Sequence, residues 1–283
     1  MNSQLPVTLP PAPDELLSSW ITRHAAFYGV APMTMLHHCL PEVTSFQKVD
    51  LCLTTDQSRR IANMFRTDSK TVRAMTFERA TKPVHRFIAK VPIQSCAKCT
   101  PSSPEPHPIL RSQLQGWRIT CAVCGEWLSN GTDTGGSEEI APYRDTALRG
   151  EKLLHDEAEG GTPSWGSPIE IARLMLIRRI SWPLPREEDR WRYRVLGVLI
   201  PEFDAILCTL TSFHHSPKHP ILPLHIRPAL LAGVEMVHRT GPEMLRMLQR
   251  HTFGPNREKF IQTSDHLVSP ILEWGPPQQM QLI

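Results

Sequence analysis

Two Cys-x-x-Cys pairs constrain this chain more than any other feature of its sequence. Cys96 and Cys99 form the first pair in "SCAKC", and Cys121 and Cys124 form the second in "TCAVCG". Each C-x-x-C turn presents two thiolates on a tight knuckle, and two knuckles supply the four sulfur ligands of a tetrahedral zinc site. Gly125 follows the last cysteine, where a residue with positive φ is often needed. The spacing therefore predicts one structural zinc ion.

Two disulfides, or unrelated core cysteines, are the alternatives to zinc. The N-terminal residues lack the basic start and apolar segment of a secretory signal. No run of about 18 apolar residues predicts a transmembrane helix. We therefore expect a cytoplasmic protein with no membrane partner, and disulfides are rare in that compartment.

The cysteine pattern also argues against catalysis by the metal. A catalytic zinc site keeps one position open for water, whereas four thiolates close the coordination sphere. The chain has no H-E-x-x-H motif, and its H-x-E at residues 155–157 follows both cysteine pairs instead of preceding them. We therefore expect a protein that is not an enzyme.

Length and composition predict a globular protein with room for two domains. The chain has 283 residues, of which 40% are hydrophobic and 21% are charged. Apolar residues recur mostly at helical spacing, which predicts a mainly α fold. We expect an N-terminal helical module with a zinc ribbon at residues 1–128, the ribbon spanning about 86–128. A loose linker region at 129–168 and a C-terminal helical domain at 169–283 are expected to follow.

Individual elements follow from spacing and capping residues. We expect helices at residues 16–28 and 33–40, from 55 onward, and after the capping residue Asp68. Residues 86–95 and 116–120 alternate well enough for short strands that lead into the cysteine pairs. In the C-terminal part, Ser167, Pro168 and Glu170 predict a helix start. Further helices are expected at 186–200, 228–239 and 242–251, the last with Thr240 as its cap.

Basic charge is concentrated in one part of the chain. The segment from Thr54 to Lys90 has a local net charge of +6, against +3 for the whole chain. Such a segment suits a face that contacts phosphates, and a solvated helical surface is the alternative. Within it, "RRIANMFRTDSKTVRAMTF" predicts a helix-turn-helix with a short basic second helix, as in a motif that reads a DNA groove. Simple helical packing is again the alternative, and the candidate nucleic-acid-binding residues are Arg59, Arg60, Lys70, Arg73 and Arg79.

These stretches together resemble a known family. "PAPDELLSSWITRHAAFYGV" is similar to the opening of the TniQ family, the target-selection proteins of bacterial transposons. The basic hairpin and the segment from "CAKC" to "CAVCGEWL" match the order of elements in that family. The resemblance is good over residues 6–128 and loose beyond them. Ala97 stands where the family usually has Pro, and Cys124 where it often has His, although Cys serves equally well as a ligand.

The resemblance implies a non-catalytic adaptor. Such proteins recognise target DNA or a guide-RNA effector complex and recruit the transposon's AAA+ ATPase, and through it the transposase. A homodimer is a further assembly that we consider. A host transcription regulator that reads an operator is the alternative function, and a zinc enzyme is a third.

The surface beside the ribbon is the candidate docking site for the ATPase. Trp is enriched at the energetic centres of protein interfaces, and Trp127 lies next to the second cysteine pair. The loop from Pro101 to His107 is the second candidate. The alternative is that Trp127 and Trp117 fill the small core of the ribbon.

Overall fold

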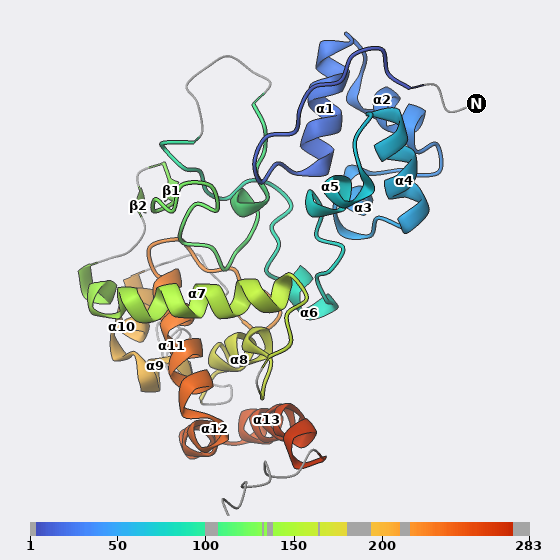
Figure 1. Cartoon of the computed structure of the whole chain (residues 1–283). Coiled ribbons are helices and arrows are strands. Elements are labelled where there is room, and N and C mark those ends of the chain that lie inside the picture. Colours follow the sequence, from blue (N-terminus) through green and yellow to red (C-terminus); the bar gives the residue numbers. More distant parts are fainter. Residues whose placement is uncertain are drawn as a thin grey trace, which may run out of the picture. The chain divides into compact units, whose positions relative to one another are not determined.

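The computed structural model of the chain describes residues 4–99, 107–131, 133–134, 138–163, 165–179, 194–209 and 216–273. The chain divides into two compact units. The first contains residues 1–135 with 158–160, and the second contains residues 136–157 with 161–283. Helices dominate the described residues, so the prediction of a mainly α fold is confirmed (Figure 1).

The first unit begins with six helices. They are α1 (Leu17–Phe27), α2 (Pro32–Cys39), α3 (Phe46–Leu51), α4 (Thr55–Met64), α5 (Ser69–Ala74) and α6 (Lys82–His85). A short 3-10 helix, η1, follows at Arg111–Gln113. The unit ends in a two-stranded antiparallel sheet of β1 (Ser129–Asn130) and β2 (Asp133–Thr134), in which Ser129 pairs with Thr134.

Local capping fixes where the hairpin of α4 and α5 turns. Thr54 and Gln57 form a reciprocal capping box at the start of α4. The Asp68 carboxylate accepts a hydrogen bond of 2.8 Å from the Thr71 amide and so caps α5, as predicted. Between the helices Arg66 adopts a positive φ of 52°, which lets the chain reverse.

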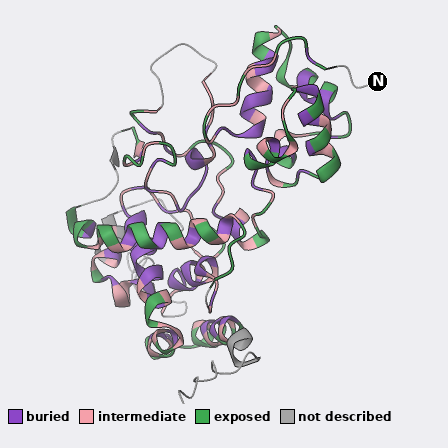
Figure 2. Ribbon diagram, in the orientation of Figure 1, coloured by how far each residue is buried: buried purple, intermediate pink, exposed green. Residues whose placement is uncertain are grey.

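One apolar core holds α1 to α5 together. Leu17, Ile21, Leu36, Ile61 and Val72 are all fully buried in it, and Figure 2 shows the buried faces of α1 and its neighbours. Apolar residues recur at helical spacing in these segments, so one face of each helix packs against this core. The core therefore supplies the rigid part of the first unit.

The extended N-terminal segment is tied to this core by hydrogen bonds. The Trp20 indole donates to the Leu9 carbonyl at 2.9 Å, and the Leu9 amide donates to His24 Nε2 at 2.9 Å. The Leu5 amide donates to the Met64 carbonyl at 3.0 Å. Side chains of α1 and the last carbonyl of α4 thus replace the partners that a sheet would give to this segment.

Helices make up most of the described residues of the second unit. It contains the 3-10 helix η2 (Glu138–Tyr143), and then α7 (Arg144–Ala158), α8 (Pro168–Met175), α9 (Leu196–Leu199), α10 (Pro201–Thr209), α11 (Arg227–Thr240), α12 (Pro242–Gln249) and α13 (Pro255–Glu273). α11 is buried along most of its length (Figure 2). A Cβ atom at Gly150 of α7 would lie 2.0 Å from the Leu231 carbonyl oxygen of α11, so glycine permits this close approach of two helices.

Three expectations about local structure are wrong. Residues 129–168 include the fifteen-residue helix α7 where a loose linker was expected, because Ala147, Gly150 and Leu154 give it one face that packs inward. Residues 86–95 and 116–120 form isolated bridges instead of strands, such as Ile88 with Gln115. The residue that precedes α12 as its cap is Gly241, with a positive φ of 85°, and not Thr240.

Several other helix predictions are confirmed. α1, α2 and α11 lie where their apolar spacing predicted them. The Ser167 side chain accepts from the Glu170 amide at 3.1 Å and so starts α8 as expected. Of the helix expected at 186–200, residues 186–193 lie outside the described part and α9 occupies 196–199. In the described part of the chain, no helix combines the length and apolar character needed to cross a membrane.

Candidate metal centre and basic surface

Short hydrogen-bonded turns position the two cysteine pairs. Ser95, which precedes the first pair, exchanges two backbone hydrogen bonds of 2.8 Å with Ser129. In the second pair, the Cys121 amide donates to the Glu126 carbonyl and the Gly125 amide donates to the Cys121 carbonyl. Gly125 has a φ of 76°, so the predicted need for a positive φ after the last cysteine is met.

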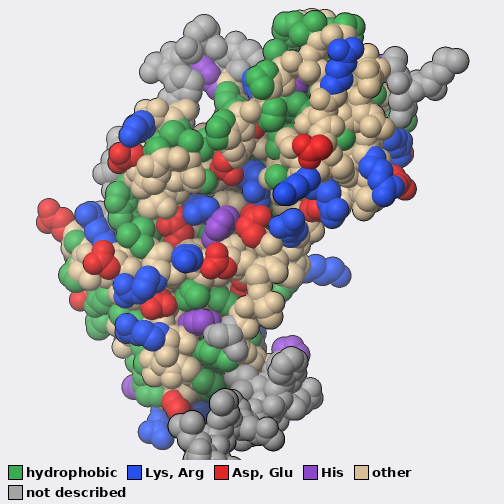
Figure 3. Space-filling view, in the orientation of Figure 1, with side chains coloured by type: hydrophobic (Ala, Val, Ile, Leu, Met, Phe, Trp, Pro, Cys, Tyr) green, Lys and Arg blue, Asp and Glu red, His purple; other side chains and the backbone are tan. Residues whose placement is uncertain are grey.

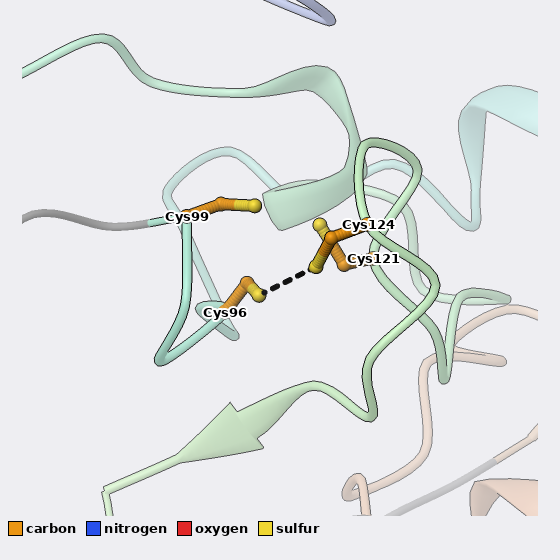
Figure 4. A group of neighbouring side chains, drawn as sticks. All are labelled: Cys96, Cys99, Cys121 and Cys124. Carbon is orange, nitrogen blue, oxygen red and sulfur yellow. Dashed lines mark hydrogen bonds between the residues drawn. The ribbon is translucent and has the colours of Figure 1, made fainter.

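These turns bring all four thiols into one cluster. The Sγ atoms of Cys96, Cys99, Cys121 and Cys124 all lie within 4.8 Å of one another. Cys96 and Cys124 are the facing members of the two pairs, with 3.5 Å between their sulfur atoms (Figure 4). Cys96 and Cys121 are buried, and the other two are half-buried. The sequence therefore predicted correctly that these cysteines meet, and together they could bind a metal ion.

The pKa values of the thiols reflect how closely the four sulfur atoms interact. The Glu126 amide lowers the pKa of the Cys124 thiol to about 7, because this N–H group stabilises the thiolate. Hydrogen bonding to Cys124 raises the pKa of Cys99 to about 12, since the two sulfurs compete for one proton. Burial raises the pKa of Cys121. A divalent cation among the sulfurs would replace these shared protons and allow all four cysteines to ionise.

The two tryptophans near the cluster differ in burial. Trp117 is 1% exposed and packs inside the first unit. Trp127 is half-buried, and its backbone forms a bridge with Thr120 just before the second cysteine pair. Of the candidate docking loop from Pro101 to His107, residues 101–106 lie outside the described part. Trp127 thus keeps an accessible portion beside the cysteine cluster.

The five predicted nucleic-acid-binding residues fall into two groups. On α4, Arg59 pairs with Asp56 at 3.1 Å, and Arg60 makes two hydrogen bonds to the Glu42 carboxylate. These acidic partners neutralise part of the positive charge of α4. Figure 3 shows basic and acidic side chains interspersed over this part of the first unit.

The second group lies on α5 and just after it. Lys70, Arg73 and Arg79 are exposed and line one hollow of the first unit. Arg73 pairs with Glu78, whereas Lys70 and Arg79 make no ion pair with any described residue. The α5 group therefore keeps more uncompensated positive charge than the α4 group.

Arg111 belongs to the same hollow and was not among the predicted residues. Its guanidinium lies 5.0 Å from the centre of the Phe77 ring and also pairs with Glu159. Arg111 is far from Arg73 in the sequence, between the two cysteine pairs, so no local charge pattern links them. Only the fold of the first unit brings this fourth basic residue to the hollow.

Comparison with known proteins agrees with the order of these elements. Residues 6–125 match the model of the TniQ family, so the match spans the helical hairpin and both cysteine pairs. Neither the curated proteins nor the solved structures contain a significant match to the chain. The N-terminal part of this chain, residues 6–125, therefore belongs to the TniQ family.

Proposed function

We propose that this chain is a non-catalytic adaptor in transposition. It recognises a target, either DNA or a guide-RNA effector complex, and recruits the transposon's AAA+ ATPase and thereby the transposase. The observation that carries this proposal is the TniQ match over residues 6–125, which associates the chain with transposition. A transcription regulator remains the alternative, and no observation on the described residues favours it.

Zinc is the metal that best suits the cysteine cluster in this proposal. Thiolate ligands in a closed set of four are typical of structural zinc. A Zn–S bond of about 2.3 Å implies sulfur atoms about 3.8 Å apart in a tetrahedron. The distances in the cluster, 3.5 Å for one pair and at most 4.8 Å for any pair, bracket that value. The ion would hold the two knuckles as a zinc ribbon and leave no position for a reacting water.

The basic hollow is the proposed contact with nucleic acid. Exposed Lys and Arg side chains that lack acidic partners are free to bind phosphate oxygens. Lys70 and Arg79 meet this condition among the described residues, and Arg73 and Arg111 add charge beside them. Arg59 and Arg60 would contribute less, because each already pairs with a carboxylate.

The proposed ATPase contact lies beside the zinc ribbon. Trp127 is half-buried, so part of the residue is accessible to a partner. Val123, at 44% exposed, lies on the second knuckle and extends the apolar surface. A rigid ribbon presents such side chains with little loss of conformational entropy on binding.

The test measures transposition in cells together with co-precipitation of the ATPase. Deletion of the whole gene should abolish targeted insertion if the chain is the adaptor. Trp127→Ala in a folded, metal-loaded protein should reduce both ATPase recovery and insertion, by about tenfold or more if Trp127 is an interface hot spot. Insertion at the parental frequency and at the parental sites after gene deletion would overturn the proposal.

A matched pair of double variants tests the nucleic-acid contact in the same assay. Lys70→Gln/Arg79→Gln and Arg59→Gln/Arg60→Gln each remove two positive charges. For the purified protein on target DNA, the first pair should lower the salt dependence of log affinity by about 2, since each lost phosphate contact removes about one unit of slope. The second pair should change the slope less. Equal effects of the two pairs would assign the contact to charge in general and not to the hollow.

A further inference from the structure

A cavity of about 210 Å³ lies inside the first unit, separate from the metal cluster and the basic hollow. Residues from α1, α3 and α6 and from the segments around 88–92 and 109–114 surround it. Its wall is mostly apolar and includes Leu16, Phe46, Leu51, Phe77, Ile109 and Leu114. Pockets for drug-sized ligands measure roughly 300–1,000 Å³, so this cavity is too small for a nucleotide and has the size of one side chain.

One wall of this apolar cavity carries a buried carboxylate. Asp50, on α3, is only 8% exposed, and its Oδ1 atom accepts a hydrogen bond of 3.0 Å from the Ser18 amide. Asp50 forms no ion pair with any described residue. Burial raises the pKa of Asp50 to about 7, although Ser18 stabilises the charged form. A buried acid without a charged partner is costly, so a group that compensates it would bind with a gain in stability.

A second acceptor lines the same cavity. His85, on α6, hydrogen-bonds to the Ala80 backbone, while its Nε2 atom is buried and has no partner among the described residues. Burial lowers the pKa of His85, so the ring is neutral near pH 7. Because a neutral imidazole that donates one N–H accepts at its other nitrogen, Nε2 is an unsatisfied acceptor.

The donors available to these two acceptors are few. Lys90 also lines the cavity, but its side chain is exposed and forms no ion pair with any described residue. The cavity therefore combines an apolar wall with an unsatisfied nitrogen acceptor, His85 Nε2, and with a carboxylate, Asp50, that Ser18 hydrogen-bonds through both its side chain and its amide but that has no cationic partner among the described residues. An occupant that matches it has an aliphatic stem and a cationic, donor-rich tip. Lysine and arginine side chains have this combination, since their stems pack on apolar surfaces while their heads donate hydrogen bonds.

We propose that this cavity receives a lysine or arginine side chain from a partner protein. The stem lies against the apolar wall, and the cationic head takes Asp50 and His85 as its acceptors. This inference rests on the cavity, the buried carboxylate and the unpartnered nitrogen, and it does not depend on the adaptor function. It assigns the first unit a protein-binding site distinct from the surface around Trp127.

The test uses side-chain analogues as probes with the full, metal-loaded chain. n-Butylammonium reproduces the lysine side chain, n-propylguanidinium reproduces that of arginine, and n-butanol is the uncharged control. Binding is followed by NMR at the Asp50 carboxyl carbon and neighbouring amides. The cations should bind saturably, and at least about tenfold more tightly at pH 8 than at pH 5, because Asp50, with a pKa of about 7, is mostly ionised only at the higher pH. Lys90 is the other charged group that lines the cavity.

Matched variants separate the carboxylate from general charge. Asp50→Asn keeps the acceptor for the Ser18 amide and should lose about tenfold or more of the cation binding together with its pH dependence. Asp56→Asn, on the exposed surface of α4, should bind like the parent. If Asp50→Asn does not fold, Ala89→Leu, which adds volume to a residue that lines the cavity, should block the probes while leaving Asp50 in place.

Three results would overturn the proposal. One is the absence of saturable binding by either cation. Another is n-butanol binding as tightly as n-butylammonium without dependence on pH. The third is binding to Lys90→Met but not to the parent, which would mean that Lys90 itself occupies the cavity.

Discussion

Within the first unit, residues 17–74 and residues 95–129 are held in place by different means. The first segment buries large apolar side chains such as Trp20, Leu36 and Phe65 in a common core. The second buries few, among them Trp117, Ile119 and Leu128, and forms no strand before Ser129 and no helix beyond one turn of 3-10 helix in its described residues. Apolar burial contributes roughly 25 cal/mol per Å², so it accounts for much less of the stability of the second segment.

We therefore expect the cysteine segment to gain much of its stability from the proposed metal ion. Its described backbone hydrogen bonds are scattered, such as Leu128 to Ile119 at 2.9 Å and Cys121 to Glu126 at 2.8 Å. In small metal-binding domains the free energy of metal binding is also folding free energy. The comparison leads us to expect that one unit joins a part stabilised by its apolar core to a part stabilised by the proposed metal ion.

Residues 109–112 mark the border between the two parts. The Leu16 amide donates to the Ile109 carbonyl at 2.8 Å, and the Ile109 amide donates to the Ser19 hydroxyl at 2.8 Å. The Arg111 amide donates to the Asp14 carbonyl at 2.7 Å. This border segment belongs by sequence to the loop between the cysteine pairs, but its hydrogen bonds join it to the start of α1.

Among our predictions, removal of the metal ion should have the largest effect on the difference in stability between residues 17–74 and residues 95–129. Cys121→Ser should release the metal ion and unfold residues 95–99 and 119–129, since structural zinc contributes on the order of 10 kcal/mol in zinc-finger peptides. The helices α1 to α5 should keep their protection against hydrogen exchange. Exchange measured residue by residue, with elemental analysis for metal, checks both statements.

The chain offers a matched control for this substitution. Cys52→Ser makes the same chemical change at an exposed cysteine outside the cluster, and it should leave metal content and exchange unchanged. Loss of protection in α1 to α5 after Cys121→Ser would mean that the two parts fold as one. Parental protein purified without chelator that contains no metal would refute the metal site itself.

The sequence predicted those features that depend on neighbouring residues. Regular apolar spacing predicted α1, a single capping residue, Asp68, predicted the start of α5, and the C-x-x-C spacing predicted the cysteine cluster. α3 was missed because its six residues are too few to show a helical period. α7 was missed because Gly150 and many polar residues mask a buried face that exists only against α11.

Features that join distant segments could not be predicted from one sequence. The cavity with Asp50 needs α1, α3, α6 and residues 109–114 to come together. The same holds for Arg111, which reaches the basic hollow through the fold. Neither residue stands out by spacing or local charge, so only the tertiary arrangement identifies them.

A substitution in the apolar core of residues 17–74 tests whether the helical segment can be destabilised without loss of the metal ion. Trp20→Ala removes a side chain that is 1% exposed, donates to the Leu9 carbonyl, and has its ring centre 4.7 Å from the centre of the Phe65 ring. Such deletions cost about 3–5 kcal/mol, and chemical denaturation followed by the exchange of α1 amides measures the loss. The cysteine cluster should still bind one equivalent of metal. Loss of metal together with the helical core would show that the border at residues 109–112 transmits unfolding.

The smallest expected effect is the pH dependence of the contribution that His24 makes to folding stability. This side chain is fully buried, and its Nδ1 bonds to the Trp20 carbonyl, which can only accept, so Nδ1 carries the proton. Nε2 then accepts from the Leu9 amide. Burial lowers the pKa of His24 below its ordinary value of 6.5. A second proton would require the hydrogen bond to the N-terminal segment to break.

The sign of the effect follows from these pKa values. The unfolded chain binds a proton at His24 near pH 6.5 and the folded chain only at lower pH, so His24 contributes its full stability above pH 6.5 and loses it as the pH falls below that value. Asp50 has the opposite sign, because its pKa rises from 3.8 to about 7 on folding, and it favours the folded state at low pH.

The difference in stability between the parent and His24→Gln removes the Asp50 contribution, which both proteins share. This difference, measured from the exchange of α1 amides, should be constant above pH 7 and shrink below pH 6.5, whereas His38→Gln on the exposed face of α2 should show no such trend. A difference that does not change between pH 7 and pH 5 would mean that the N-terminal segment is held by the apolar core and not by His24.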